Sequence, residues 1–418
     1  MKLLKRIVFS SCLGAFVAIG VAVGLKNRTR ILAASKEPIF RSGAGLKWKV
    51  SEGRVADDPL PEFAPSLMGK LCYSFTKFQV PPQSFLVLRE GTRTTTLDFS
   101  GNGAQSPNAP NFSPDGRSLA LLMGAPDADF PNCELDVLNL QTGAIRVVSK
   151  RTIQFEVIEW SRDGRYLAFV AGGDAEGRPV FEDGIQDHPS LWMCDVRSGG
   201  EWCAAKNNDG VNGGFKWGEN DELFFSVQTK NQGSSILKMK PGGGATPVLS
   251  EARSPLPSLS GSQIAFVRWT NEFVKPIPPA LCVAQSNGTK RRVLRREDAR
   301  TLPVFAWSRD EKRLFRIGWD ATSRRGEVLS FNVQSGKSQR IGQFQSAAYK
   351  GLAPSFANLH EERTGELVCN VNSITGNLDQ DYYSASQTLQ SLDAKGQLRV
   401  WATSTGSSTL AWHSSDAG

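Results

Sequence analysis

Glu159-Trp160-Ser161-Arg162-Asp163-Gly164-Arg165-Tyr166-Leu167-Ala168-Phe169-Val170 is the stretch that decides the fold, because weaker copies of it return along the chain from residue 71 onward. Trp160 ends an extended run. Ser161 to Gly164 then form a turn, in which Ser and Asp can bond nearby backbone and Gly supplies a positive φ. The run from Leu167 to Val170 is short, apolar and bounded by turn signals, which is typical of a strand buried on both faces.

Three landmarks recur along the chain in the same order. The first is an aromatic residue or leucine that closes an extended run, at Phe112, Trp160, Trp217, Leu259, Trp307, Phe356 and Trp412. The second is the first residue of an apolar strand, at Leu71, Leu119, Leu167, Leu223, Ile264, Leu314 and Leu367. The third is the glycine of a hairpin, at Gly91, Gly143, Gly199, Gly243, Gly288, Gly336 and Gly396. Their spacing of about 50 residues fits four short strands per unit, the period of propeller blades.

The repeats predict an all-β, seven-bladed β-propeller over residues 67–418, with six blades as the alternative. The chain enters the repeat at its second landmark, Leu71, and leaves it at its first, Trp412. We therefore expect a strand at 408–415 to be the innermost strand of the blade whose other strands come from about residues 69–98. Such a closure removes the open edge that a row of sheets would leave.

Two of the copies identify a family resemblance. Asn111-Phe112-Ser113-Pro114-Asp115-Gly116-Arg117 and Trp160-Ser161-Arg162-Asp163-Gly164-Arg165 resemble the W-S-P-D-G-(K/R) signature of TolB-like propeller repeats. Trp307-Ser308-Arg309-Asp310 is a fair copy and Trp217-Gly218-Glu219-Asn220-Asp221 is a degenerate one. The resemblance covers roughly residues 67–418. It implies the fold, and it says very little about function.

The first thirty residues have the pattern of a membrane-targeting segment. Lys2, Lys5 and Arg6 precede the uncharged stretch 7–25, and basic residues follow it. That length is close to the roughly 20 apolar residues that span a bilayer, so an uncleaved anchor is favoured over a cleaved signal peptide. A short tail before a large body predicts a body outside the cytoplasm, periplasmic or extracellular, or secreted if the segment is cleaved. The proline-containing stretch 31–66 predicts a linker with one strand at 46–50.

The net charge of +8 does not indicate nucleic-acid binding once it is located. Six of the 49 basic residues lie in the first thirty positions, which leaves 43 against 41 acidic residues for the remainder. A nearly neutral body is not the electrostatic footprint of a nucleic-acid-binding protein. The one remaining basic cluster, Lys290-Arg291-Arg292-Val293-Leu294-Arg295-Arg296, falls on the last strand of a hairpin, where charge protects an exposed sheet edge.

Two enzyme classes use similar propellers. Prolyl-oligopeptidase-like peptidases add an α/β-hydrolase domain, but this chain has no G-x-S-x-G elbow. Oligogalacturonate-lyase-like enzymes need clustered histidines for a metal, and of His188, His360 and His413 only His188 lies in a plausible face loop. The sequence therefore predicts no catalytic residue, cofactor or metal site. A cation site among the acids of the 172–190 insertion is a minor alternative.

Two of the cysteines flank one hairpin. Cys194 and Cys203 are each four residues from the centre of the Ser198-Gly199 turn, so the sequence places them directly opposite one another. A cross-strand disulfide and two thiols are equally compatible with that position.

The lengths of the connections predict where a ligand binds. In a four-stranded blade, the loops between strands two and three and those between blades emerge on one face, and tight turns emerge on the other. The loops of the first kind are long, at 124–132, 172–190, 269–279, 320–326 and 372–387. Candidate recognition residues in them are Phe130, Phe181, His188, Trp269, Phe273, Arg324, Arg325, Tyr382 and Tyr383. They predict a binding or scaffolding module for a protein, peptide or glycan. A lyase or hydrolase acting on an extracellular polymer and a structural component of an envelope complex are the alternatives.

Overall fold

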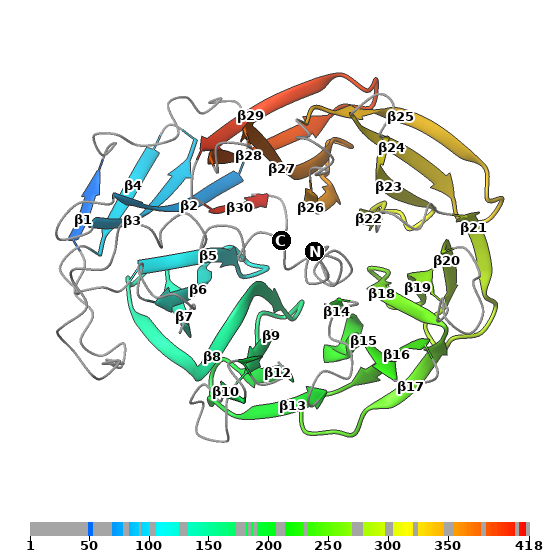
Figure 1. The fold of residues 1–418 in the computed structure, drawn as a ribbon, viewed down its shortest axis with the longest axis horizontal. Coiled ribbons are helices and arrows are strands. Elements are labelled where there is room, and N and C mark those ends of the chain that lie inside the picture. The colour runs from blue at the N-terminus through cyan, green and yellow to red at the C-terminus, as the bar shows by residue number, and fades with distance from the viewer. Residues whose placement is uncertain are drawn as a thin grey trace.

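Seven β-sheet blades are arranged in a ring (Figure 1). The computed structural model describes residues 49–52, 69–77, 83–91, 93–99, 106–124, 133–172, 181–182, 185–186, 190–205, 214–229, 233–269, 279–296, 304–320, 325–346, 355–377, 382–405 and 409–414. The predicted seven-bladed all-β fold is therefore confirmed.

The first three blades depart from simple chain order, because blade 1 takes a strand from the C-terminus and blades 2 and 3 share one strand. Blade 1 contains β2 (Gly69–Lys77), β3 (Gln83–Glu90), β4 (Arg93–Asp98) and the C-terminal β30 (Thr409–Ser414), with β1 (Lys49–Glu52) added outside β4. Blade 2 contains β5 (Ser106–Phe112), β6 (Ser118–Gly124), β7 (Cys133–Asn139) and the first part of β8 (Ile145–Trp160). Blade 3 contains the rest of β8, β9 (Tyr166–Gly172), β12 (Ser190–Asp195) and β13 (Glu201–Ala205), and the short pair β10 (Phe181–Glu182) and β11 (Ile185–Gln186) lies in its insertion. Because β8 is continuous, blades 2 and 3 share one seven-stranded sheet.

The remaining four blades are separate four-stranded sheets in simple chain order. Blade 4 contains β14 (Phe215–Trp217), β15 (Leu223–Thr229), β16 (Gly233–Met239) and β17 (Thr246–Ser250), with a 3₁₀ turn, η3 (Glu219–Asp221), after β14. Blade 5 contains β18 (Ala252–Pro257), β19 (Gln263–Arg268), β20 (Ala280–Gln285) and β21 (Arg292–Arg296). Blade 6 contains β22 (Val304–Trp307), β23 (Arg313–Asp320), β24 (Arg325–Asn332) and β25 (Ser338–Phe344). Blade 7 contains β26 (Ser355–Glu361), β27 (Leu367–Asn377), β28 (Tyr382–Leu392) and β29 (Leu398–Thr405).

The blades are held together by apolar packing between neighbouring sheets. Every residue of β9 is buried, as its apolar run predicts. Leu167 and Phe169 pack into a core shared with blade 2, whereas Tyr166 and Val170 pack into a core shared with blade 4. Since burying one large apolar side chain contributes about 1.5–3 kcal/mol, each blade depends on both neighbours for its stability.

Tryptophan side chains add a polar link between the inner strands of neighbouring blades. The indole N–H of Trp160 donates to the carbonyl oxygen of Asn111, at 3.0 Å, on the inner strand of the preceding blade. Trp217 and Trp307 donate in the same way to Glu159 and Leu256, at 3.0 and 2.9 Å. The first landmark of the repeat is thus a contact between blades.

β2 and β30, from opposite ends of the repeats, lie side by side. β30 pairs antiparallel with β2, with Leu71 opposite Trp412, in the register that Leu167 and Trp160 have in blade 3. The stretch expected to be a linker also contributes, because β1 pairs with β4, with Lys49 opposite Asp98. That strand begins three residues after the start of the strand expected at 46–50.

Two of the seven first landmarks were misassigned from the sequence. Leu259 does not close a strand but lies in the turn that follows β18, with 52% of its surface exposed. Phe356 lies at the start of β26, whose turn begins five residues later, after Glu361. In blade 5 the turn is instead marked by Ser258, whose N–H bonds the Gln263 carbonyl.

The predicted position of the two hairpin cysteines is wrong. Cys194 lies opposite Glu201, and Cys203 lies opposite Trp192, so the two thiols are two residues out of register and are not bonded to each other. The reason is the turn. Asp195 accepts hydrogen bonds from the N–H groups of Arg197 and Ser198 through its side chain, and its carbonyl accepts the Gly199 N–H. The loop is therefore centred on Arg197 and Ser198, and not on Ser198 and Gly199.

The predicted membrane segment, residues 7–25, lies outside the described residues. Within the part of the chain that the structure describes, no helix has the length and apolar character needed to cross a bilayer.

Removing residues 408–418 should destabilise the whole propeller. The deletion takes away β30, exposes the inner edge of β2, and leaves Leu71 and Cys72 without the strand that covers them. We expect the melting temperature to fall by well over 2 °C, since about 1 kcal/mol moves a domain of this size by a few degrees. Deletion of residues 416–418 alone, beyond β30, is the control. Equal melting temperatures for the two deletions would contradict a closing role for β30.

Candidate binding face

The ring has two faces of different construction. The turns after each inner strand and the hairpins between strands three and four emerge on one face, which we call the turn face. The connections between strands two and three and those between blades emerge on the opposite face, which we call the loop face. The two faces differ in how their described residues are held.

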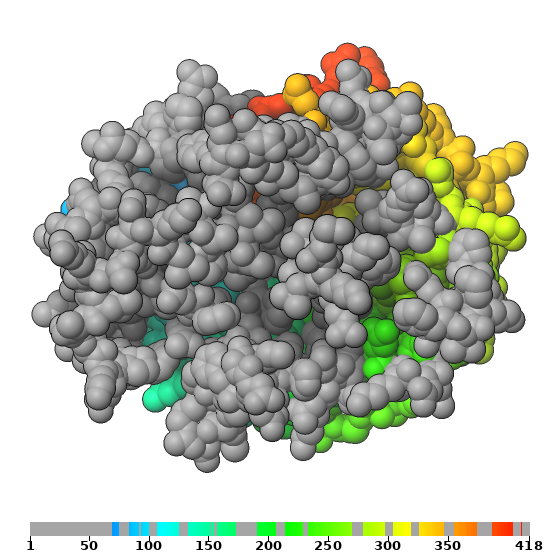
Figure 2. Space-filling view, viewed as in Figure 1, coloured from blue at the N-terminus to red at the C-terminus, as the bar shows by residue number. Residues whose placement is uncertain are grey.

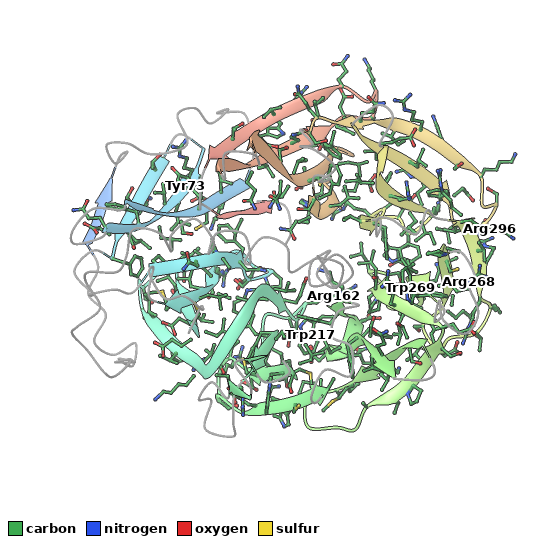
Figure 3. All side chains as sticks on the ribbon, in the orientation of Figure 1. Tyr73, Arg162, Trp217, Arg268, Trp269 and Arg296 are labelled. Carbon is green, nitrogen blue, oxygen red and sulfur yellow. The ribbon has the colours of Figure 1, made fainter. Side chains whose placement is uncertain are left out.

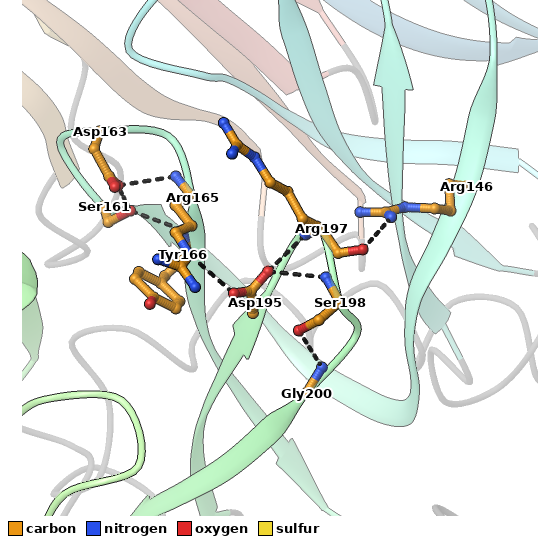
Figure 4. Close-up of polar contacts among 9 residues, drawn as sticks. All are labelled: Arg146, Ser161, Asp163, Arg165, Tyr166, Asp195, Arg197, Ser198 and Gly200. Carbon is orange, nitrogen blue, oxygen red and sulfur yellow. Dashed lines mark hydrogen bonds and ion pairs between the residues drawn. The ribbon is translucent and has the colours of Figure 1, made fainter.

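The tight turns of the turn face are fixed by a buried serine and an aspartate. Ser161 is fully buried; its hydroxyl donates to the Asp163 carboxylate at 2.6 Å and accepts the Tyr166 N–H at 2.8 Å (Figure 4). Gly164 follows with φ of +69°, which costs a glycine little. Ser113 and Asp115, and Ser308 and Asp310, repeat the same 2.6 Å contact. The aspartates of the repeat are therefore turn residues, as the sequence indicates.

Hydrogen bonds also join one blade's hairpin to the start of its second strand. Arg165 donates through Nε to the Asp195 carboxylate at 3.0 Å (Figure 4). Burial alone would raise the pKa of Asp195, but the N–H groups of Ser198 and Arg197, with Arg165, lower the pKa below its ordinary value. Asp195 is thus held ionised as part of the turn-face scaffold.

Arg162 ties blade 3 to blade 5 across the turn of blade 4. Its guanidinium donates to the carbonyl oxygens of Leu259 and of Ser258, the latter at 2.8 Å. Burial lowers the pKa of Arg162, while the carboxylates of Glu219 and Glu311 oppose that effect. In Figure 3 Arg162 lies on the inner side of the ring.

The same face carries further links between blades. Glu311, in the turn of blade 6, accepts hydrogen bonds from the N–H and the hydroxyl of Ser260 in blade 5, the latter at 2.6 Å. Glu361 of blade 7 accepts the Arg309 N–H at 2.8 Å and pairs with the Arg313 guanidinium at 3.0 Å. Glu311 has φ of +56° at the position that Gly164 occupies in blade 3. A non-glycine residue there costs about 1–2 kcal/mol, so the sequence accepts strain where this contact forms.

The loop face is built differently, from strands that extend beyond the blade. β27 and β28 are each 11 residues long, against six in β19. At about 3.3 Å per residue the longer pair projects roughly 16 Å further. The connections expected at 320–326 and 372–387 are consequently shorter than predicted, because β23 continues to Asp320 and β27 to Asn377.

The predicted recognition residues fall into three groups. Phe130, His188, Phe273 and Arg324 lie outside the described residues. Phe181, Arg325, Tyr382 and Tyr383 begin strands β10, β24 and β28 at the loop face, where their backbone is described. Trp269 is half-buried, and the Arg253 guanidinium of its own blade lies 3.2 Å from its ring centroid (Figure 3). The described part of the chain contains no group of three His, Cys, Asp or Glu side chains that could hold a metal ion.

The basic cluster occupies the outer wall of the ring. β21 is the outermost strand of blade 5, and Arg295 and Arg296 on it are exposed. This strand and the outer strands of blade 6 form the coloured wall at the right of the space-filling view (Figure 2). Among the described residues these arginines have no acidic partner within ion-pair distance. Such charges on an outer strand discourage pairing with a further strand.

One buried acidic pair was missed by the sequence analysis. Asp136 is fully buried and Glu134 is 2% exposed, and both lie on the same side of β7 because they are two residues apart. Among the residues that the structure describes, both oxygens of Asp136 and Oε1 of Glu134 have no hydrogen-bond partner. Burial, with the charge of Glu134, raises the pKa of Asp136 to about 8. Burial also raises the pKa of Glu134, against the effect of Lys150.

No protein-family model and no curated protein sequence matches this chain. Solved structures share its fold. A prolyl endopeptidase matches with a TM-score of 0.51 at 12% identity, over 82% of this chain and 51% of its own. TolB from Acinetobacter baumannii matches at 0.39 and 14%, over 65% and 63%, and oligogalacturonate lyase from Vibrio parahaemolyticus at 0.46 and 10%, over 81% and 98%. The chain thus spans about half of the endopeptidase and less than two thirds of TolB. At 12% identity, the match to the prolyl endopeptidase shows a shared fold and nothing about function.

The buried Asp136 should make stability fall as the pH rises. Its pKa is about 8 in the folded chain and near 3.8 when unfolded, so between these values the native state holds a proton that the unfolded chain has released. In the cation-free protein, the free energy of unfolding should decrease from pH 4 towards pH 8 and then level off. Asp136→Asn should flatten that profile, whereas Glu251→Gln, an exposed control, should not. Parallel profiles for Asp136→Asn and the wild type, measured by denaturant titration, would show that Asp136 titrates normally.

Proposed function

We propose that this protein is a TolB-like propeller that binds a protein, peptide or glycan on its loop face, as a recognition or scaffolding module without catalysis of its own. The observation that supports it is the difference between the two faces. On the turn face, polar side chains such as Arg162 and Glu311 are engaged in bonds between blades and are not available to a ligand. The loop face instead carries projecting strand ends and insertions that differ from blade to blade. Binding residues concentrate on such variable segments supported by a rigid scaffold.

We propose further that residues 7–25 hold the protein at a membrane, with the propeller outside the cytoplasm. The support comes from the sequence, namely an uncharged stretch of bilayer-spanning length between basic flanks. A ligand on the loop face would then be an envelope or extracellular component.

Substitutions on the two faces should distinguish the face that binds the partner from the face that serves as scaffold. Once a partner is captured from native membranes, Trp269→Ala combined with Arg324→Ala and Tyr382→Ala should weaken its binding at least tenfold, because aromatic and arginine side chains dominate binding energies. The matched variant replaces Lys312, Lys337 and Lys395 with Ala; these exposed side chains lie on turn-face connections and have no ion-pair partner among the described residues. Titration by surface plasmon resonance measures both. Loss of binding only in the lysine variant, or equal loss in both, would place the site elsewhere.

The full-length chain should sediment with membranes and resist extraction by high salt, whereas a chain beginning at Lys36 should remain in the supernatant. The reason is the loss of the apolar stretch 7–25. Fractionation followed by N-terminal sequencing of the mature protein measures both. A mature N-terminus at Leu25 or Lys36 would indicate a cleaved signal peptide and secretion.

A further inference from the structure

The acidic pair of β7 lies at the interface between blades 2 and 1. Cys133, Leu135 and Val137 point towards blade 3, where they pack with Trp160 and Phe169. Glu134, Asp136 and Leu138 alternate with them and therefore face blade 1. Leu138 confirms this direction, since it shares a core with Leu86, Leu97 and Phe99 of blade 1.

The side chains next to Glu134 and Asp136 offer little to neutralise or hydrogen-bond their carboxylates. On the neighbouring strand β6, Leu121 lies opposite Asp136 and Met123 lies opposite Glu134, and both are buried and apolar. On the other side, Val147 of β8 lies opposite Asp136. Among the described residues, the cation whose charge acts on Glu134 is the exposed Lys150. A buried carboxylate without a hydrogen bond is costly and calls for a bound ion or proton.

The other blades show that this position does not require an acid. The strand registers identify the residue equivalent to Asp136 in each blade. It lies two positions before the residue that pairs with the second landmark of that blade. In five blades that residue is not ionisable at neutral pH and largely apolar, namely Val87, Trp192, Leu237, Cys282 and Leu329. Only blade 7 has a second polar residue here, Gln390.

Blade 7 also shows what a polar side chain needs at this position. Gln390 is buried, and its Nε2 donates to the Gln345 carbonyl and to Thr388 Oγ1, both at 2.7 Å. Its Oε1 accepts the Gln345 N–H at 2.9 Å. Thr388 occupies the position of Glu134, and Phe344, just before Gln345, packs against Leu392 as Phe99 packs against Leu138. In blade 2 the carboxylate of Asp136 stands where the donating amide of Gln390 stands in blade 7.

We propose that Glu134 and Asp136 bind a hard, oxygen-preferring divalent cation, of which Ca²⁺ is the probe, between blades 1 and 2. Three carboxylate oxygens have no partner in the described part of the chain, namely Glu134 Oε1 and both oxygens of Asp136. Ca²⁺ takes six to eight oxygen ligands in flexible geometry, so beyond these carboxylates the ion would need further oxygens from water or main-chain carbonyls. The cation takes the place of the donor groups that Gln390 supplies in blade 7. It would add to the apolar packing that holds the first two blades together.

The test is calcium binding by the full-length protein in detergent, after treatment with a chelator. Equilibrium dialysis at pH 8 should find one Ca²⁺ per chain, and saturating CaCl₂ should raise the melting temperature by at least several degrees over KCl of equal ionic strength. The response should be smaller at pH 6, because protons compete for the same oxygens. Mg²⁺ at the same concentration is measured in parallel.

Two variants make the assignment specific. Asp136→Asn and Glu134→Gln should each lose the bound ion and the thermal response, while Glu251→Gln, an exposed acid, should keep both. Asparagine and glutamine preserve the side-chain volume, and the cation-free melting temperature of each variant shows whether it folds. The proposal is overturned if neither Ca²⁺ nor Mg²⁺ binds the wild type, or if Asp136→Asn binds as the wild type does.

Discussion

The pairing of β30 with β2 is the contact on which the other blade interfaces depend. Each blade presents two apolar faces, as the fully buried β9 illustrates, and can cover both only when it has a neighbour on each side. A linear row of seven sheets would expose one face at each end. Drawing the inner strand of blade 1 from the C-terminus makes that blade depend on both ends of the chain. Covering the terminal faces is therefore coupled to bringing residues 69 and 414 together.

A ring closed in this way separates structural from recognition surfaces. The inner turns all converge on one face, where they are close enough for side chains to reach a neighbouring blade or, as with Arg162, the next but one. Those contacts engage the charged groups that a ligand would otherwise use. On the other face β27 and β28 extend to 11 residues each within a ring of otherwise shorter blades. The length variation among the connections of that face supports its proposed binding role.

The sequence predicted the repeat well because the repeat rests on local chemistry. Ser161, Asp163 and Gly164 specify their turn through bonds within six residues, and the copies in blades 2 and 6 keep the same spacing. The blade 5 and blade 7 copies were misplaced because they lack the aromatic residue, and a nearby Leu259 or Phe356 was taken instead. The cysteine register failed for a related reason. A single carboxylate, that of Asp195, bonds two N–H groups and moves the centre of the turn, which spacing alone does not reveal.

Burial by a neighbouring blade was the property that was hardest to predict from the sequence. Alternation in Cys133-Glu134-Leu135-Asp136-Val137 would normally place the acids towards water, and only the ring brings blade 1 over them. A chain that keeps two such carboxylates must compensate them with a proton or with a cation, and these have opposite dependence on pH. A proton is released as the pH rises, so an interface neutralised by protonation weakens. An interface neutralised by a cation strengthens, because the competing proton is removed. The sign of the pH dependence with and without divalent ions therefore decides which of the two occupies the position that Gln390 fills in blade 7.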